Sequence, residues 1–309
     1  MKTSHQPSRP TFLLATLLTL VASLLPFAAA ATPDSATDGA ATEAVWHTEL
    51  DPALAAAAGD DRYLIVDLYA EWCGWCKRMD AQVFSTPSFA EFAADYVLLR
   101  VDVEDQGEGT WLQYRLGANS LPTLAVLAPD MALVGLVQGF RPEAILLSAI
   151  ESHVAGYETK RAGLDAAVAG GTLQERLEAA ERLRQMQAGA AAADAFRKVA
   201  GDDSWSLVER LRIAVATADS LRLARRYADA DAELERARRL LAAGQLDDDA
   251  RDDTAGLLDI AALTLAEELE DCQKLAALED FVHDRTASPL IGQARDRLDH
   301  LKSEDFGCS

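Results

Sequence analysis

The feature that most constrains this chain is a pair of cysteines at C-x-x-C spacing, Cys73 and Cys76, between a predicted strand and a predicted helix. The strand, residues 64–69, is a short apolar run with β-branched members, which is typical of a buried strand. A helix that begins next to the motif places Cys73 at a helix N-terminus. The unpaired N–H groups and the dipole of a helix N-terminus favour an anion there, which lowers the pKa of a thiol and activates it.

Such a pair predicts disulfide exchange in two steps. Cys73 attacks the disulfide of a partner and forms a mixed disulfide. Cys76, which we expect to be more buried, then attacks Cys73 and releases the reduced partner. Two other interpretations stay open: half of a zinc site, for which the sequence has no second C-x-x-C, and a structural disulfide without turnover. We expect neither a resident metal nor an organic cofactor.

Strand and helix patterns alternate in the order β-α-β-α-β-β-α, which predicts a mixed sheet with helices on both faces. Pro129 and Asp130 should form a tight turn, so the last two strands should be antiparallel. The predicted domain spans residues 44–156. Its strands are residues 64–69, 96–103, 123–127 and 132–137, and its helices are residues 77–92, with a break at 85–87, then 110–116 and 142–153.

Two separate segments of this domain resemble the thioredoxin superfamily. Residues 65–77 resemble its active-site segment, and Leu121-Pro122-Thr123 matches the family's second motif, just before a strand. The resemblance covers about a third of the chain and implies a thioredoxin-like fold and thiol–disulfide oxidoreductase activity. It also implies that Pro122 is cis and faces the cysteines, and that Asp67 is a buried carboxylate that accepts a proton from the second cysteine.

Residues around the motif should contact the substrate. The candidate contacts are Trp72, Gly74, Trp75, Leu121 and Thr123. Trp75 stands where thioredoxin has proline, and the residue between the cysteines tunes the preferred direction of exchange. Residues 83–89 resemble the periplasmic thiol-transfer domain of a bacterial membrane reductase family. Together with Leu121 they favour reduction, with isomerisation left open. The expected partners are proteins with a disulfide or dithiol, and a membrane thiol reductase as electron donor.

The N-terminus predicts export. Lys2 and Arg9 precede an uncharged stretch at residues 11–25, and small residues at 28–31 follow it. This order is typical of a signal peptide, residues 1–30, cleaved near Ala30. An uncleaved anchor is the alternative. Residues 31–43 should form a flexible lead-in, and the mature chain should be periplasmic or secreted, where disulfides persist.

Residues 157–309 form a predicted all-helical domain. Ala192, Phe196 and Val199 share a spacing with Ala230, Leu234 and Ala237, and this resembles a tetratricopeptide array. A generic helical bundle is the other interpretation. Helix arrays offer concave surfaces, so this domain could select a protein partner. Cys272 and Cys308 could form a disulfide that ties down the C-terminal tail.

The formal net charge of −21 argues against a nucleic-acid-binding protein, which needs a basic surface. Two further hypotheses remain beside the oxidoreductase. In one, the helical domain is the working part of a non-catalytic binding or chaperone-like protein. In the other, the reduced cysteines carry a metal ion for delivery.

Overall fold

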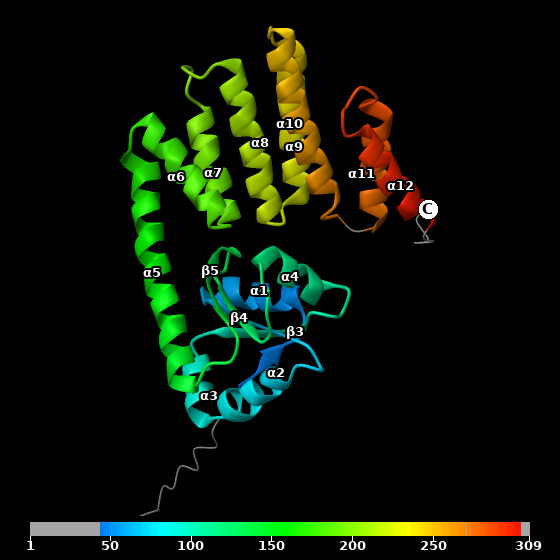
Figure 1. Cartoon of the computed structure of the whole chain (residues 1–309). Helices are drawn as coiled ribbons and strands as arrows, with labels where there is room; N and C mark the ends of the chain where they lie inside the picture. The colour runs from blue at the N-terminus through cyan, green and yellow to red at the C-terminus, as the bar shows by residue number, and fades with distance from the viewer. Residues whose placement is uncertain (1–43, 270, 304–309) are drawn as a thin grey trace, which may run out of the picture. The chain divides into compact units, whose positions relative to one another are not determined.

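The computed structural model describes residues 44–269 and 271–303. A five-stranded mixed sheet, in the order β1-β3-β2-β4-β5, forms the centre of the first part of the chain (Figure 1). Strands β1, β3 and β2 are parallel, β4 is antiparallel to β2, and β5 is antiparallel to β4. The strands are β1 (Trp46–His47), β2 (Leu64–Tyr69), β3 (Val97–Asp102), β4 (Thr123–Leu127) and β5 (Leu133–Gln138).

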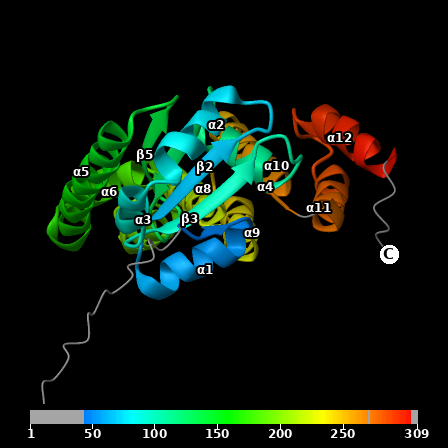
Figure 2. The same ribbon diagram turned by 90° about the horizontal axis from the view of Figure 1, so that it is seen from below.

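Helices cover both faces of this sheet, as the sequence predicts (Figures 1 and 2). Alternate side chains of β2 point to opposite faces, so Leu64 and Val66 pack with α1 and α4, while Ile65 packs with α2, η1, α3 and α5. The helices are α1 (Leu50–Asp60), α2 (Gly74–Met79), the π-helix η1 (Asp80–Phe84), α3 (Pro87–Ala93), α4 (Glu108–Leu116) and α5 (Glu143–Gly170).

The structure adds one strand and one helix that the sequence pattern does not reveal, β1 and α1. Strand β1 has only two residues, too few for a period-2 pattern. Helix α1 contains five alanines, which form helix readily but give little contrast between an apolar and a polar face. The predicted break in the helix after the motif is confirmed, because Thr86 caps α3 by accepting a hydrogen bond from the Phe89 amide and Pro87 occupies its first turn.

Helix α5 is longer than the sequence pattern indicates. It is continuous through Gly156, so the expected boundary at residues 156–157 falls inside a helix of 28 residues. A Cβ added at Gly156 would meet no atom within 4 Å, so no close packing requires glycine there. A single glycine costs a helix about 1 kcal/mol, which the neighbouring turns can offset.

The rest of the described chain is helical. These helices are α6 (Leu173–Gln185), α7 (Gly189–Ala200), α8 (Leu207–Leu223), α9 (Tyr227–Ala243), α10 (Asp248–Ala266), α11 (Asp271–Asp284) and α12 (Ile291–Ser303). Each packs chiefly against its neighbours in sequence, as in an array of antiparallel helices. Both predicted apolar stripes are buried, including Phe196 and Leu234, although their repeat family stays a prediction.

Short apolar side chains join this array to the β4–β5 hairpin. Ala128 and Ala132 belong to one buried cluster with Ala180 and Leu183 of α6. The amide of Leu133 donates a hydrogen bond of 3.1 Å to the carbonyl of Met186 at the end of α6. Within the described ranges, no helix has the length and apolar character needed to cross a membrane.

Candidate active site

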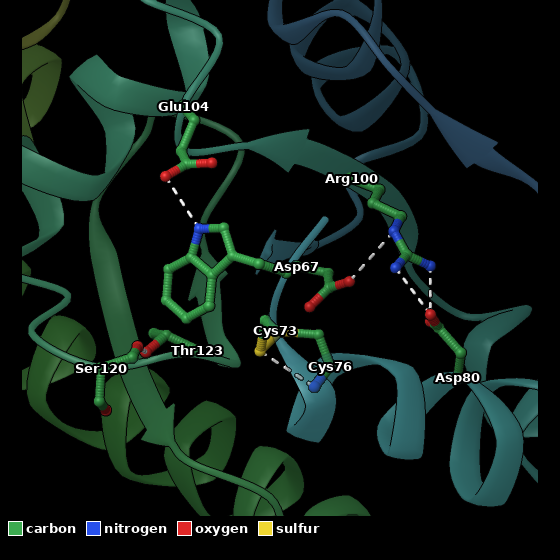
Figure 3. The surroundings of a disulfide bond; sticks show 9 residues. Asp67, Cys73, Cys76, Asp80, Arg100, Glu104, Ser120 and Thr123 are labelled. Carbon is green, nitrogen blue, oxygen red and sulfur yellow. Dashed lines mark hydrogen bonds and ion pairs between the residues drawn. A yellow bond between two sulfur atoms is a disulfide. The ribbon is translucent and has the colours of Figure 1, made fainter. Parts of the chain in front are cut away.

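The two cysteines lie at the junction of β2 and α2, and they are bonded to each other (Figure 3). Cys73 is the N-cap residue of α2, and its Sγ accepts a hydrogen bond from the amide of Cys76 at 3.1 Å. One backbone donor in the first turn of α2 therefore already points at this sulfur, which is an arrangement that stabilises a thiolate. Cys73 is 3% exposed and Cys76 is 2% exposed, so the expected difference in burial is absent in the disulfide form.

A buried carboxylate faces the cysteine pair from β2. Asp67 is 1% exposed, and Figure 3 shows its side chain between the cysteines and Arg100. In the parallel register of β2 and β3, Asp67 lies directly opposite Arg100. The Arg100 Nε is 3.4 Å from the Asp67 Oδ2, yet neither carboxylate oxygen has a hydrogen-bond partner among the described residues. This carboxylate can therefore take up a proton at low cost.

Arg100 is held by a second acid. Its two terminal nitrogens lie 2.6 and 2.9 Å from the carboxylate oxygens of Asp80, at the start of η1, in a bidentate pair. Its guanidinium also stacks 4.3 Å from the ring centre of Tyr69. Because Asp80 engages both terminal nitrogens of Arg100, only the Nε faces Asp67.

Burial raises the pKa of Asp67 to about 7, from 3.8 in solvent, although the charge of Arg100 acts in the opposite direction. Asp80 adds a smaller contribution that also raises this pKa. Near neutral pH, both protonation states of Asp67 are consequently populated. A group with this property can accept a proton from a neighbouring thiol and return it.

The Leu121–Pro122 peptide is cis, as the family resemblance implies. The carbonyl of Pro122 accepts a hydrogen bond of 2.7 Å from the amide of Gly139, and the hydroxyl of buried Thr123 donates one of 2.6 Å to the Ser120 carbonyl. Gly139 has a φ of +74°, a conformation that suits glycine. These bonds hold the loop before β4. The catalytic role of Pro122 and the contacts of Leu121 and Thr123 with substrate stay predictions.

The two tryptophans of the motif are exposed, Trp72 at 69% and Trp75 at 55%. The indole nitrogen of Trp72 donates a hydrogen bond of 2.9 Å to Glu104. The ring of Trp75 instead packs 5.8 Å from that of Phe140, which follows β5. Gly74, the first residue of α2, has nothing within 4 Å of a Cβ added to it. Large exposed apolar side chains beside a reactive sulfur are typical of a protein-binding surface.

Sequence reasoning misses the partners that come from distant segments: Arg100, Asp80, Glu104 and Phe140. The arginine at residue 100 inside an apolar strand was the available signal, because a charge in a buried strand requires a partner. The other three have no local signature, since each reaches the site through tertiary packing.

Other predictions concern parts of the chain that the structure does not describe. Cys272 lies in α11, but Cys308 is outside the described residues, so their pairing stays a prediction. Residues 1–43, with the expected signal peptide, are also outside them. Over the described ranges, no group of three or more His, Cys, Asp or Glu side chains is placed to hold a metal.

Comparison with known proteins gives matches to the first part of the chain. The family model described as thioredoxin-like matches residues 45–129. Thioredoxin of Staphylococcus aureus is 35% identical over 94 residues, which are 29% of this chain and 81% of that protein. The thiol:disulfide interchange protein DsbD of Pseudomonas fluorescens is 36% identical over 83 residues, which are 26% of this chain but only 14% of that relative.

Solved structures match the same part. A thioredoxin from Thermus thermophilus has 30% identity and a TM-score of 0.33, covering 36% of this chain and 86% of that one. A structure titled DsbH oxidoreductase has 18% identity and a TM-score of 0.36, covering 40% of this chain and 94% of that one.

Proposed function

Because the chain belongs to the thioredoxin-like family through residues 45–129, we propose that it is a thiol–disulfide oxidoreductase that reduces or isomerises disulfides of other proteins. One observation carries this proposal. The sulfur of Cys73 caps α2, its bonding partner is Cys76, and a carboxylate with a pKa of about 7 faces the pair. This arrangement combines a nucleophile, a resolving thiol and a proton acceptor.

The reaction begins from the dithiol. The thiolate of Cys73 attacks one sulfur of the partner's disulfide, so that a mixed disulfide forms and the partner's other sulfur leaves as a thiolate. Cys76 then gives its proton to Asp67 and attacks the Cys73 sulfur. A Cys73–Cys76 disulfide forms, and the partner is released with two electrons gained. Its two sulfurs become thiols by taking one proton from Asp67 and one from solvent. In isomerisation, the freed partner thiolate attacks another disulfide of the same molecule. A partner thiolate released there then attacks the mixed disulfide, so that Cys73 leaves as a thiolate and the chain stays in its dithiol form.

A catalytic cycle also needs a source of electrons. Each reductive turnover leaves the Cys73–Cys76 disulfide, so a dithiol must reduce it again. We propose a membrane thiol reductase as that donor, acting outside the cytoplasm after removal of residues 1–30. The basic and apolar N-terminal segments support export. Similarity to proteins named thiol:disulfide interchange protein supports the exchange chemistry.

Two single substitutions test the proposal. We expect Cys73→Ser to abolish the reduction of insulin disulfides with dithiothreitol as reductant, because the attacking thiolate is lost. Cys76→Ser should keep the first step but lose the second, so it should accumulate a covalent complex with its substrate on non-reducing gels. A Cys73→Ser protein that turns over insulin at the wild-type rate would contradict the mechanism. If the helical domain alone is the working part, Cys73→Ser should still bind its partner with unchanged affinity.

The reduction potential of the Cys73–Cys76 pair tests the direction of exchange. A value near about −270 mV, like that of thioredoxin, would support reduction, and a value between roughly −180 and −120 mV would indicate isomerisation or oxidation. Equilibration in graded thiol–disulfide buffers, followed by alkylation and mass spectrometry, gives this value for each cysteine separately.

A further inference from the structure

One side of the candidate active site combines aromatic rings with arginines. Trp75 and Arg78 are three residues apart in α2 and thus share a face of that helix. The guanidinium carbon of Arg78 lies 5.3 Å from the ring centre of Trp75 and 4.8 Å from that of Phe140. Arg141 follows Phe140 directly and is also exposed. We refer to these four residues, Trp75, Arg78, Phe140 and Arg141, as the basic aromatic face.

The basic aromatic face adjoins both the cysteine pair and the loop that contains the cis-proline. Trp75 lies between the two cysteines in sequence, and Phe140 follows Gly139, whose amide is bonded to the carbonyl of Pro122. A protein segment that reaches the Cys73 sulfur beside the cis-proline loop therefore passes next to the basic aromatic face.

The positive charges of this face are not neutralised by the described part of the chain. The Nε of Arg78 donates a hydrogen bond of 3.0 Å to the neutral side chain of Gln82, and Arg141 donates one of 2.9 Å to the Phe140 carbonyl. Between residues 44–269 and 271–303, neither arginine has an ion pair.

In the described residues, neither of the acids nearby in sequence forms an ion pair with these arginines. Asp80 is paired with Arg100, and Glu143 accepts hydrogen bonds from Thr86 and Ser88. Two arginines without an ion pair in the described residues thus lie next to the reactive cysteines, in a chain with a net charge of −21. A planar guanidinium that is already stacked on aromatic rings loses little freedom when it binds a carboxylate.

We propose that the basic aromatic face selects substrate segments that carry an aspartate or glutamate close to the reacting cysteine. The carboxylate pairs with Arg78 and Arg141, while apolar neighbours of the substrate cysteine contact the rings of Trp75 and Phe140. This selection rests on the proposed function, because it acts on the substrate whose disulfide is reduced. The C-x-x-C motif itself does not determine this feature of the substrate, an acidic residue close to the reacting cysteine.

The test compares two disulfide-bonded peptides that differ only in one residue next to a cysteine, aspartate in one and asparagine in the other. The reduced full chain donates two electrons to each peptide, and the second-order rate constants are measured at low ionic strength. The rate on neutral 2-hydroxyethyl disulfide normalises each protein variant. We expect the wild type to prefer the aspartate peptide by about two- to fivefold, the range of an exposed ion pair. High salt should remove this preference.

Variants assign the preference to the face. Arg78→Gln and Arg141→Gln should each reduce it, and the double variant should abolish it. Arg239→Gln is the matched control, because it removes one exposed arginine of α9 that has no ion pair in the described chain, and it should keep the full preference.

Failure of the proposed selection and failure of the proposed function give different results. Equal rates on the two peptides, or a preference that survives in the double variant, would overturn the selection while leaving the proposed function intact. A wild-type protein that reduces neither peptide nor 2-hydroxyethyl disulfide would overturn the proposed function and the selection with it.

Discussion

At the scale of single residues, burial changes the chemistry of Asp67 more than that of its neighbours. The strand that carries it is apolar because it is covered on both faces. Burial of a carboxylate at its centre therefore costs the free energy of hydration of that group. Arg100 offsets this cost only partly, because its terminal nitrogens are occupied by Asp80. The site therefore retains a destabilising group, which is the usual sign of a functional constraint rather than of folding.

The cost of burying Asp67 should appear in the pH dependence of the free energy of unfolding. The folded chain with Asp67 at a pKa of about 7 retains a proton between pH 4 and pH 7 that the unfolded chain has lost, so stability falls as the pH rises through this window. Asp67→Asn cannot lose a proton. We expect it to stabilise the oxidised protein at pH 8 by up to about 4 kcal/mol, and by progressively less as the pH falls to 4. Urea unfolding at several pH values measures this, and a gain that does not vary with pH would contradict the argument.

At the scale of elements, the sheet and α5 meet through a glycine. Gly135 of β5 packs against His153, and a Cβ at this position would lie 2.2 Å from the Cγ of that ring. The ring cannot retreat easily, because its Cγ is close to the backbone of a regular helix. Gly156, one turn further along the same helix, has open space around it. These two glycines look alike in sequence but serve different purposes.

Substitution by alanine should change stability in opposite directions at these two glycines. We expect Gly135→Ala to destabilise the chain by about 1–3 kcal/mol, the usual cost of an overpacked contact. Gly156→Ala should stabilise it by about 0.5–1 kcal/mol, because alanine is the better helix former. Thermal unfolding of both variants beside the wild type provides the measurement. A Gly135→Ala protein as stable as the wild type would show that the contact with His153 does not restrict this position.

At the scale of the whole molecule, α5 belongs to both parts of the chain. Its N-terminal half, with Leu146 and Ile150, packs on the sheet, while Tyr157 and Val168 share a buried cluster with α6 and α7. Tyr157 also meets the ring of Tyr63 edge-on, at 6.2 Å. A boundary drawn at a glycine would thus divide one rigid element and remove side chains that cover the sheet.

Truncation tests this role of α5. We expect a fragment of residues 44–170 to be more stable than one of residues 44–156, because the shorter fragment loses Tyr157 and the ion pair of Arg161 with Asp130 at 3.3 Å. Removal of a large buried side chain costs about 3–5 kcal/mol. The denaturant midpoints of the two fragments measure this difference in stability. Equal midpoints would show that residues 157–170 do not support the sheet.

Local pattern predicts most of the sheet and the centre of the site. Four strands lie within one residue of their expected bounds, and the cis peptide at Pro122 is where the family resemblance places it. These predictions succeed because a strand, a helix start and a tight turn depend on residues that are close together in the chain.

Local sequence pattern predicts two cysteines at a helix N-terminus after a buried strand, and the family resemblance implies a buried acid at Asp67. The side chains that surround them come from distant segments and are seen only in the folded chain. The register of β2 and β3 places Arg100 opposite Asp67, the start of η1 brings Asp80 to Arg100, and the end of β5 brings Phe140 to Trp75 and Arg78. Such pairings join segments that are far apart in the chain. They depend on strand register and packing over the whole domain, which no local pattern of residues contains.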